Sequence, residues 1–162
     1  MNILEQSRTE LDALYAQGSV GQIPTGSSQG TAVFFPGLPI LNKAMARVAK
    51  AFWAGKVIAT DGASLTNKVL TAFQGFKAEV YRGPSWYDGK ESIIIDYSKT
   101  SFSCQRVRDE MREIEPGRFL GRAYIRKQAA GKEAISDSPE ALQRNGVLAV
   151  YFYLKFPKAA NA

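Results

Sequence analysis

Residues 83–101 hold the densest group of side chains that could do chemistry in this sequence of 162 residues. A turn that contains Trp86 leads into the aliphatic run 93–95, which ends in the carboxylate of Asp96 and the phenol of Tyr97. Polar groups crowded at the end of an apolar strand must find partners or line a cavity. The segment therefore predicts a ligand pocket, although no catalytic signature within it dictates a reaction.

Asp96 and Tyr97 cannot both point into such a pocket, because side chains of a strand alternate between its two faces. Asp96 shares a face with Ile94, and Tyr97 shares the other with its isoleucine neighbours. A buried Asp96 without an arginine partner would have a raised pKa and would be a candidate general base. The alternative is that Asp96 and Ser98 only bond to neighbouring backbone at a strand end.

Residues 105–114 form a second charged segment, which we interpret as a strand because a Pro-Gly turn follows it. Such a strand suits either a polar barrel interior or an ion-pair ladder between strands, and the alternative is a ladder exposed to solvent. The alternation places Val107, Asp109, Met111 and Glu113 on one face, and Arg108, Glu110, Arg112 and Ile114 on the other.

Arginines of this strand and the next are candidates for holding an acidic ligand. Arg108 or Arg112 could grip a carboxylate through two parallel hydrogen bonds. Arg122, Tyr124 and Arg126 share one face of the following strand and could line the same site or face solvent.

The composition excludes several kinds of site. Cys104 is the single cysteine and there is no histidine, so disulfides within the chain, Cys/His or Ser/His nucleophiles and the common zinc sites cannot be built. Cys104 has no evident activating neighbour in the sequence. We therefore expect no metal and no cofactor.

Two segments with helical spacing flank the first predicted strand. Residues 1–24 are predicted to form a short docking helix and a linker. Residues 39–54 form a stronger pattern, in which Leu41, Met45, Val48 and Phe52 recur at helical steps. We expect this helix to pack its apolar stripe against a sheet.

The remaining sequence predicts a mainly β domain that spans residues 1–162. Short turns favour antiparallel neighbours, and the last strand is apolar on both faces, so it should be covered on both. We expect a lipocalin-like antiparallel β-barrel of about eight strands with one or two accessory helices, and a curved open sheet over one helix is the alternative. Residues 128–146 are too long for a hairpin and are predicted to be a long loop or lid. The predicted strands are 31–35, 56–60, 64–71, 76–82, 91–97, 105–114, 118–126 and 147–156.

Several short strings carry a resemblance to known proteins: Trp53-x-Gly55-Lys56, Gly83-Pro84-Ser85-Trp86-x-Asp88-Gly89-Lys90, Asp96-Tyr97-Ser98, Arg108-Asp109-Glu110 and Pro116-Gly117-x-x-Leu120-Gly121-Arg122. Over residues 9–126 the sequence resembles a group of uncharacterised bacterial proteins. The order of these elements is also similar to small lipocalin-like or calycin-like barrels, including domains described by a GxWxG motif, a string that this sequence lacks. The resemblance implies a barrel and supplies no catalytic residues.

The formal charge of +6 permits attraction to phosphates or anionic lipids. Residues 42–60 carry Lys43, Arg47, Lys50 and Lys56 without an acid, which we interpret as a basic helix face. The face has no interleaved aromatics, which argues against nucleic acid and leaves contact with an anionic membrane open. The N-terminal residues predict no secretory signal and no apolar run is long enough to span a bilayer, so we expect a cytoplasmic protein. The sequence does not indicate an oligomeric state.

The leading hypothesis is that the barrel binds a hydrophobic or amphipathic small molecule in its cavity. The turn at Trp86 would gate the cavity mouth or plug a barrel end. A second hypothesis is a cofactor-free isomerase, cyclase or dehydratase, in which Asp96 or Glu110 moves a proton and Tyr97 or an arginine stabilises negative charge. A third is a structural or partner-binding domain with a filled barrel. The predicted ligand-binding residues are Tyr81, Trp86, Asp96, Tyr97, Arg108, Arg122 and Tyr124.

Overall fold

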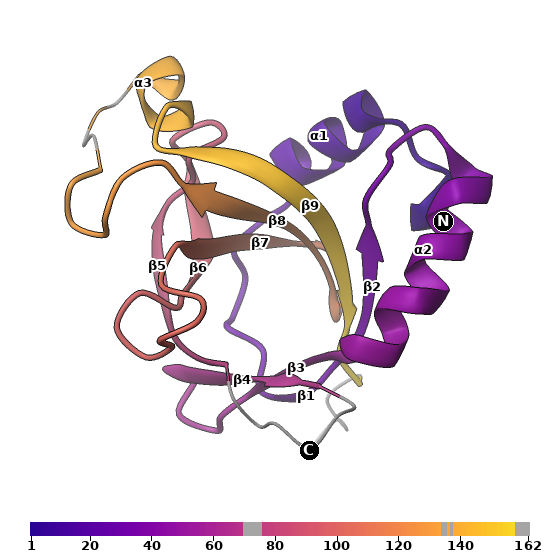
Figure 1. Cartoon of the computed structure of the whole chain (residues 1–162), viewed down its shortest axis with the longest axis horizontal. Helices are drawn as coiled ribbons and strands as arrows, with labels where there is room; N and C mark the ends of the chain where they lie inside the picture. Colours follow the sequence, from indigo (N-terminus) through magenta and orange to yellow (C-terminus); the bar gives the residue numbers. More distant parts are fainter. Residues whose placement is uncertain (70–75, 134–135, 137, 158–162) are drawn as a thin grey trace.

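Antiparallel strands form one sheet that nearly closes into a barrel (Figure 1), in a computed structural model that describes residues 1–69, 76–133, 136 and 138–157. The order of the nine strands among these residues is β1-β3-β4-β5-β6-β7-β8-β9-β2. The predicted antiparallel barrel with accessory helices is confirmed. The strands are β1 (Gly26–Ser27), β2 (Gln29–Val33), β3 (Gly55–Ile58), β4 (Ser64–Lys68), β5 (Lys77–Pro84), β6 (Glu91–Asp96), β7 (Val107–Glu115), β8 (Arg118–Arg126) and β9 (Gly146–Lys155).

The barrel closes through one segment that pairs with both edges of the sheet. β1 pairs with β3, and β2, which follows one residue later, pairs with β9. Ser28 lies between them and is bonded to Lys56, because its hydroxyl accepts from the Lys56 N–H at 3.0 Å and donates to the Lys56 carbonyl at 2.8 Å. Gly30 is required at this seam, since a Cβ there would lie 2.6 Å from the Trp53 ring. In place of β1 and β2 the sequence predicted one strand, residues 31–35.

The inward faces of the strands pack into the main core. Ile93, Ile95 and Tyr97 point inward, as the alternation predicted for one of the two faces, and Asp96 points outward. Phe152 of β9 lies against Gly121 of β8, where a Cβ would come within 2.0 Å of its ring. The buried core residues are Ile58, Leu65, Ala78, Val80, Ile93, Ile95, Tyr97, Met111, Phe119, Phe152, Leu154 and Phe156.

The N-terminal helices cover part of the outer face. After the short η1 (Ile3–Glu5), α1 (Arg8–Gln17) begins at a capping box in which Ser7 and Glu10 bond to each other's backbone. Leu11 and Tyr15 of α1 are buried against the outer side chains of β2, β8 and β9. This docking helix was predicted from its spacing, and it explains why β9 is covered on both faces. A register shift at Ala149 moves Leu148 to the outer face.

The second helix, α2 (Pro39–Phe52), contradicts the expectation that its apolar stripe packs on the sheet. Leu41, Val48 and Phe52 are exposed, and the buried residue of the helix is Asn42. The Asn42 side chain accepts from the backbone N–H groups of residues 34 and 35 and donates to the Phe35 carbonyl at 2.7 Å. A polar side chain therefore fastens α2 to the barrel.

Lys56 was also misassigned by sequence, because it does not belong to a basic helix face. It lies on β3 and is 3% exposed, with its ammonium inside the barrel. The segment predicted as a long loop contains a short helix, α3 (Pro139–Gln143). None of the helices in the part of the chain that the structure describes is long and apolar enough to cross a bilayer.

Candidate functional site

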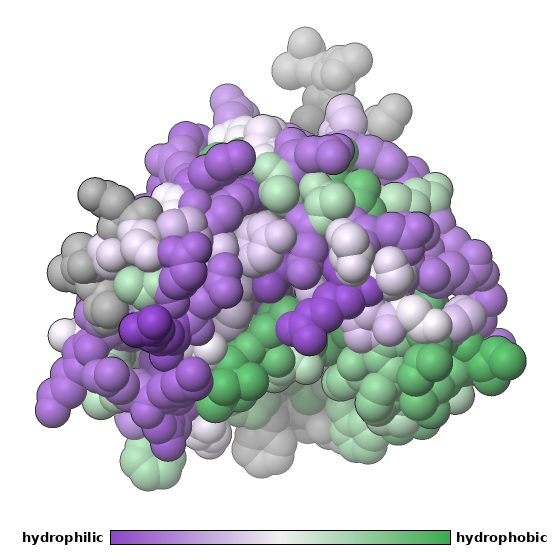
Figure 2. Space-filling view, turned by 90° about the horizontal axis from the view of Figure 1, so that it is seen from above, coloured by the Kyte–Doolittle hydropathy of each residue, from purple (hydrophilic) through white to green (hydrophobic). Residues whose placement is uncertain are grey.

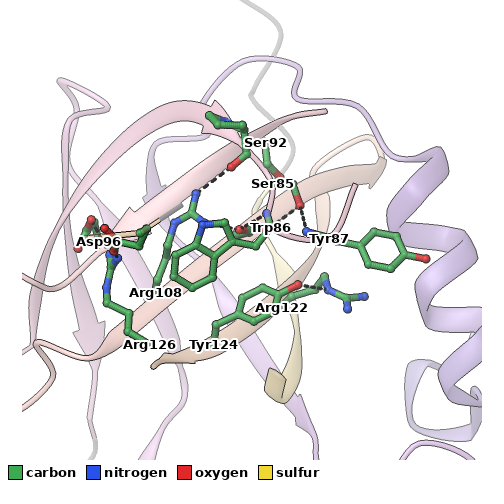
Figure 3. Close-up of polar contacts among 12 residues, drawn as sticks. Ser85, Trp86, Tyr87, Ser92, Asp96, Arg108, Arg122, Tyr124 and Arg126 are labelled. Atoms are coloured by element: carbon green, nitrogen blue, oxygen red, sulfur yellow. Dashed lines mark hydrogen bonds and ion pairs between the residues drawn. The ribbon is translucent and has the colours of Figure 1, made fainter. Parts of the chain in front are cut away.

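The charged side chains of β7 and β8 meet on the outer wall of the barrel (Figure 3). Arg108, Glu110, Arg122, Tyr124 and Arg126 are each 5% exposed or less. They are covered by α1 and by the turn between β5 and β6, so this face is neither the barrel interior nor an exposed ladder.

Trp86 forms the centre of this outer cluster. The Arg108 guanidinium lies 4.2 Å from the centre of a Trp86 ring, and the Tyr124 ring meets the indole edge to face at 5.5 Å. Gly146 of β9 leaves room for the indole, since a Cβ there would lie 2.7 Å from it. The expectation that this aromatic turn gates or plugs a barrel end was therefore wrong, because the turn lies along the outer wall.

Glu110 is fully bonded beneath the turn. One carboxylate oxygen accepts from the Trp86 N–H at 2.7 Å and from Arg108 at 2.6 Å, and the other accepts from the hydroxyls of Ser85 and Tyr15. Burial raises the pKa of Glu110, and Arg108 and Ser85 act against this rise. The carboxylate holds the turn on the sheet and is enclosed by its own partners.

Arg122 occupies a pocket of tyrosines beside this site. Its guanidinium pairs with Asp12 of α1, bonds the Tyr124 hydroxyl at 2.8 Å and lies 4.1 Å from the centre of the Tyr87 ring. Tyr151 of β9 is a second partner of Asp12. Arg122 and Tyr151 therefore attach α1 to the sheet.

The Asp96 side chain lies at the end of β6, is 14% exposed and pairs with Arg126 at 2.7 Å. Burial acts to raise the pKa of Asp96, but the N–H of Ser98 and the Arg126 guanidinium outweigh burial, and the pKa is lowered. Tyr81 donates a further hydrogen bond at 3.2 Å. Asp96 is therefore an ionised carboxylate at the end of β6. Its bond from the Ser98 N–H is the bond to neighbouring backbone that the sequence offered as the alternative to a general base.

A cleft of about 1040 Å³ opens between this outer wall and a part of the chain that includes Ala130, Glu133 and Leu142. Four of the seven predicted ligand-binding residues line it: Tyr81, Trp86, Asp96 and Arg108. The floor also contains Arg126, which pairs with Glu133 from the long loop in addition to Asp96. We call this the outer cleft; its remaining lining residues are Glu79, Pro84, Asp88, Gly89, Lys90, Ser98, Lys99, Ala130, Gly131, Ser136 and Leu142.

Tyr97 belongs to a different group, inside the barrel. Lys56 donates to the Tyr97 hydroxyl at 2.6 Å, to Asp109 at 2.8 Å and to the Asn67 carbonyl at 3.1 Å. Trp53 donates to the same Asn67 oxygen at 3.0 Å, and rings of Trp53 and Tyr97 flank the ammonium. We call Lys56, Asn67, Tyr97 and Asp109 the interior polar centre.

In the interior polar centre the surroundings of each side chain determine its protonation state. Burial acts to lower the pKa of Lys56, but Asp109 and Tyr97 outweigh burial and raise it, so the side chain is an ammonium ion. Burial and the charge of Asp109 raise the pKa of Tyr97 to about 12, so the phenol stays protonated. One oxygen of Asp109 has no partner among the described residues.

This centre was not predicted from the sequence, although the sequence contains a signal for it. Lys56, Tyr97 and Asp109 each come from a different string of the resemblance, namely W-x-G-K, D-Y-S and R-D-E. Each of the three strings supplies one residue that points into the barrel. Alternation alone cannot predict that the three side chains meet there.

The three candidate catalytic residues, two for moving a proton and one for stabilising negative charge, do not converge. Tyr97 is inside the barrel, Asp96 is on the floor of the outer cleft, and Glu110 is beneath the turn. Among the described residues no group of three or more cysteine, aspartate or glutamate side chains could hold a metal ion.

Comparison with known proteins supports the fold. No protein-family model matches the sequence, and no curated protein is significantly similar to it. A crystal structure described as a protein from Thermomonospora curvata superposes with a TM-score of 0.56 at 16% identity. The alignment covers 95% of this chain and 90% of that one. At this identity the likeness concerns the fold alone.

Proposed function

We propose that the protein binds a small amphipathic acid in the outer cleft, with Arg126 holding the acid group. The observation that carries the proposal is the pairing of Arg126 with Glu133, which brings a carboxylate from the long loop onto the cleft floor. A carboxylate of the chain itself thus fills the place that a ligand carboxylate would take.

The charges of the cleft floor allow such an exchange. The guanidinium groups of Arg108 and Arg126 face three carboxylates, those of Glu110, Asp96 and Glu133. A ligand carboxylate that replaces Glu133 leaves this balance unchanged, and charge-assisted hydrogen bonds to arginine are among the stronger ones in proteins. The Nε–H of Arg126 is buried and has no acceptor among the residues that the structure describes.

The walls of the cleft would take the apolar part of the ligand. Of the lining residues, Tyr81 is 41% exposed and Pro84 is exposed, and the largely buried Trp86 and Leu142 also line the cleft. A concave site with apolar walls and a few placed polar groups is the usual composition of a small-molecule pocket. Its volume of about 1040 Å³ accommodates a ligand of drug size.

The packing of the barrel interior is the reason to place the ligand outside. Phe152 lies directly on Gly121, and Lys56 is enclosed by the rings of Trp53, Tyr97 and Phe152. A ligand inside the barrel would have to displace these contacts, whereas the outer cleft is already open.

Isothermal titration with decanoate, decanol and decylamine tests the proposal, because the three probes share one chain and differ in the head group. We expect decanoate to bind best. Glu133→Gln should tighten decanoate binding about tenfold, because the competing carboxylate is removed from Arg126. Lys132→Gln, an exposed neighbour on the same loop, is the matched control and should leave binding unchanged.

Equal affinity for decanoate and decanol, or weaker decanoate binding by Glu133→Gln, would overturn the proposal. Glu133 is on the loop and not in the barrel wall, so the variant should keep the fold. The near-ultraviolet circular dichroism of the two variants checks this.

A further inference from the structure

The helix α2 turns its apolar side chains away from the protein. Ile40 is 87% exposed, Phe52 62% and Val48 54%. Figure 2 shows apolar residues gathered at the side of the molecule where α2 lies. We call the exposed apolar residues of this helix and the turn before it the α2 face: Phe35, Leu38, Ile40, Leu41, Val48 and Phe52.

The helix does not need this face for its attachment. Asn42, which is fully buried, holds α2 to the segment that follows β2 through both ends of its amide. A contiguous exposed apolar surface of this kind marks an interaction site when the fold does not use it.

The charges of α2 itself are all positive. Lys43, Arg47 and Lys50 follow one another at helical spacing, and the helix contains no acid. Lys43 pairs with Glu5 at 2.8 Å. The same three basic residues line a groove between α2 and β2, to which Lys68 contributes a fourth. Apolar and basic residues on one exposed helix are the composition that binds the surface of an anionic bilayer.

The length of the helix determines how it could lie on a bilayer. Its 14 residues give an axis of roughly 21 Å, which is shorter than the hydrocarbon core of a membrane. Such a helix cannot span a membrane but can lie in the plane of the interface. Its apolar side chains then enter the acyl boundary, and the lysine and arginine side chains reach the phosphates.

We infer that α2 docks the protein on membranes that contain anionic phospholipids. The apolar side chains of the α2 face insert, and Arg47 and Lys50 contact the head groups. The inference is independent of the outer cleft, because α2 contributes no residue to that cleft.

Sedimentation with sucrose-loaded vesicles tests the inference. Vesicles of 70% phosphatidylcholine and 30% phosphatidylserine should bind the protein at least about tenfold more tightly than pure phosphatidylcholine, given the contribution of each basic residue near the surface. Raising the NaCl concentration to about 0.5 M should reduce this preference, because salt screens exposed charges.

Two variants separate the contributions of the helix. Phe52→Ser with Val48→Ser should lower binding about tenfold, because both side chains are exposed and their loss does not disturb the core. Arg47→Gln with Lys50→Gln should remove most of the preference for phosphatidylserine.

Phe102→Ser is the matched control, because Phe102 is 94% exposed and lies outside α2. It should leave vesicle binding within about twofold of the unmodified protein. No sedimentation with phosphatidylserine vesicles would overturn the inference. So would a dimer in light scattering that Phe52→Ser dissociates, since a second copy would then cover the α2 face.

Discussion

Removal of the Lys56 ammonium should cost much of the stability of the fold. In Lys56→Met a side chain of similar length remains among the rings of Trp53, Tyr97 and Phe152. Asp109, which is 4% exposed, loses its cation and keeps only the hydrogen bond from Tyr97. Breaking a buried ion pair at one partner typically costs 3–5 kcal/mol, so we expect about 4 kcal/mol.

This loss is measurable by thermal unfolding. For a domain of this size 1 kcal/mol changes the Tm by roughly 2–4 °C, so the Tm of Lys56→Met should fall by roughly 8–16 °C. The double variant Lys56→Met, Asp109→Leu should recover most of that decrease, because no unpaired charge remains. Lys99→Met, which breaks the exposed pair with Glu79, is the control and should change the Tm little. A Tm loss of under about 3 °C would refute this account of the interior polar centre.

Two further predictions concern the barrel wall. Because the pKa of Asp96 is lowered in the folded protein, its contribution to stability is present above its unfolded pKa of about 3.9 and is lost as the pH falls through the lower folded value. Asp96→Asn should therefore flatten the acid limb of urea-unfolding stability between about pH 2 and 4, and an unchanged limb would contradict this. Gly121→Ala should destabilise by about 1–3 kcal/mol because its methyl group meets the Phe152 ring. Phe152→Leu in the same chain should relieve part of that cost, and additive losses in a double-mutant cycle would show that the two residues do not clash.

The strands and their alternation could be predicted from the sequence, because both depend on neighbouring residues. Between residues 56 and 126 the predicted strands begin and end within a few residues of the observed ones, except that the predicted end of the strand 64–71 lies outside the described residues. The two faces of β7 contain the residues predicted for each face. The sequence shows that only one of Asp96 and Tyr97 can point into the barrel, but it does not show which one. Alternation gives opposite faces, and only closure of the sheet decides which face is inside.

The candidate sites depended on contacts between residues far apart in the sequence. Lys56 and Asp109 are 53 positions apart, and Arg126 and Asp96 are 30 positions apart. No local pattern specifies that a lysine after a helix enters the core to meet an aspartate on another strand. The tertiary structure also decided where the outer cleft lies, because the long loop packs over the wall that carries Arg126.

The two helices show the same division between sequence and tertiary structure. The sequence determined that residues near 8–17 and 39–52 are amphipathic helices, because helical periodicity and caps are local properties. The tertiary structure decided that α1 buries its apolar face on the barrel while α2 is fastened by Asn42 and exposes its apolar face. Hydrophobicity gives a helix an apolar side, but which surface covers that side depends on the space left by the rest of the fold.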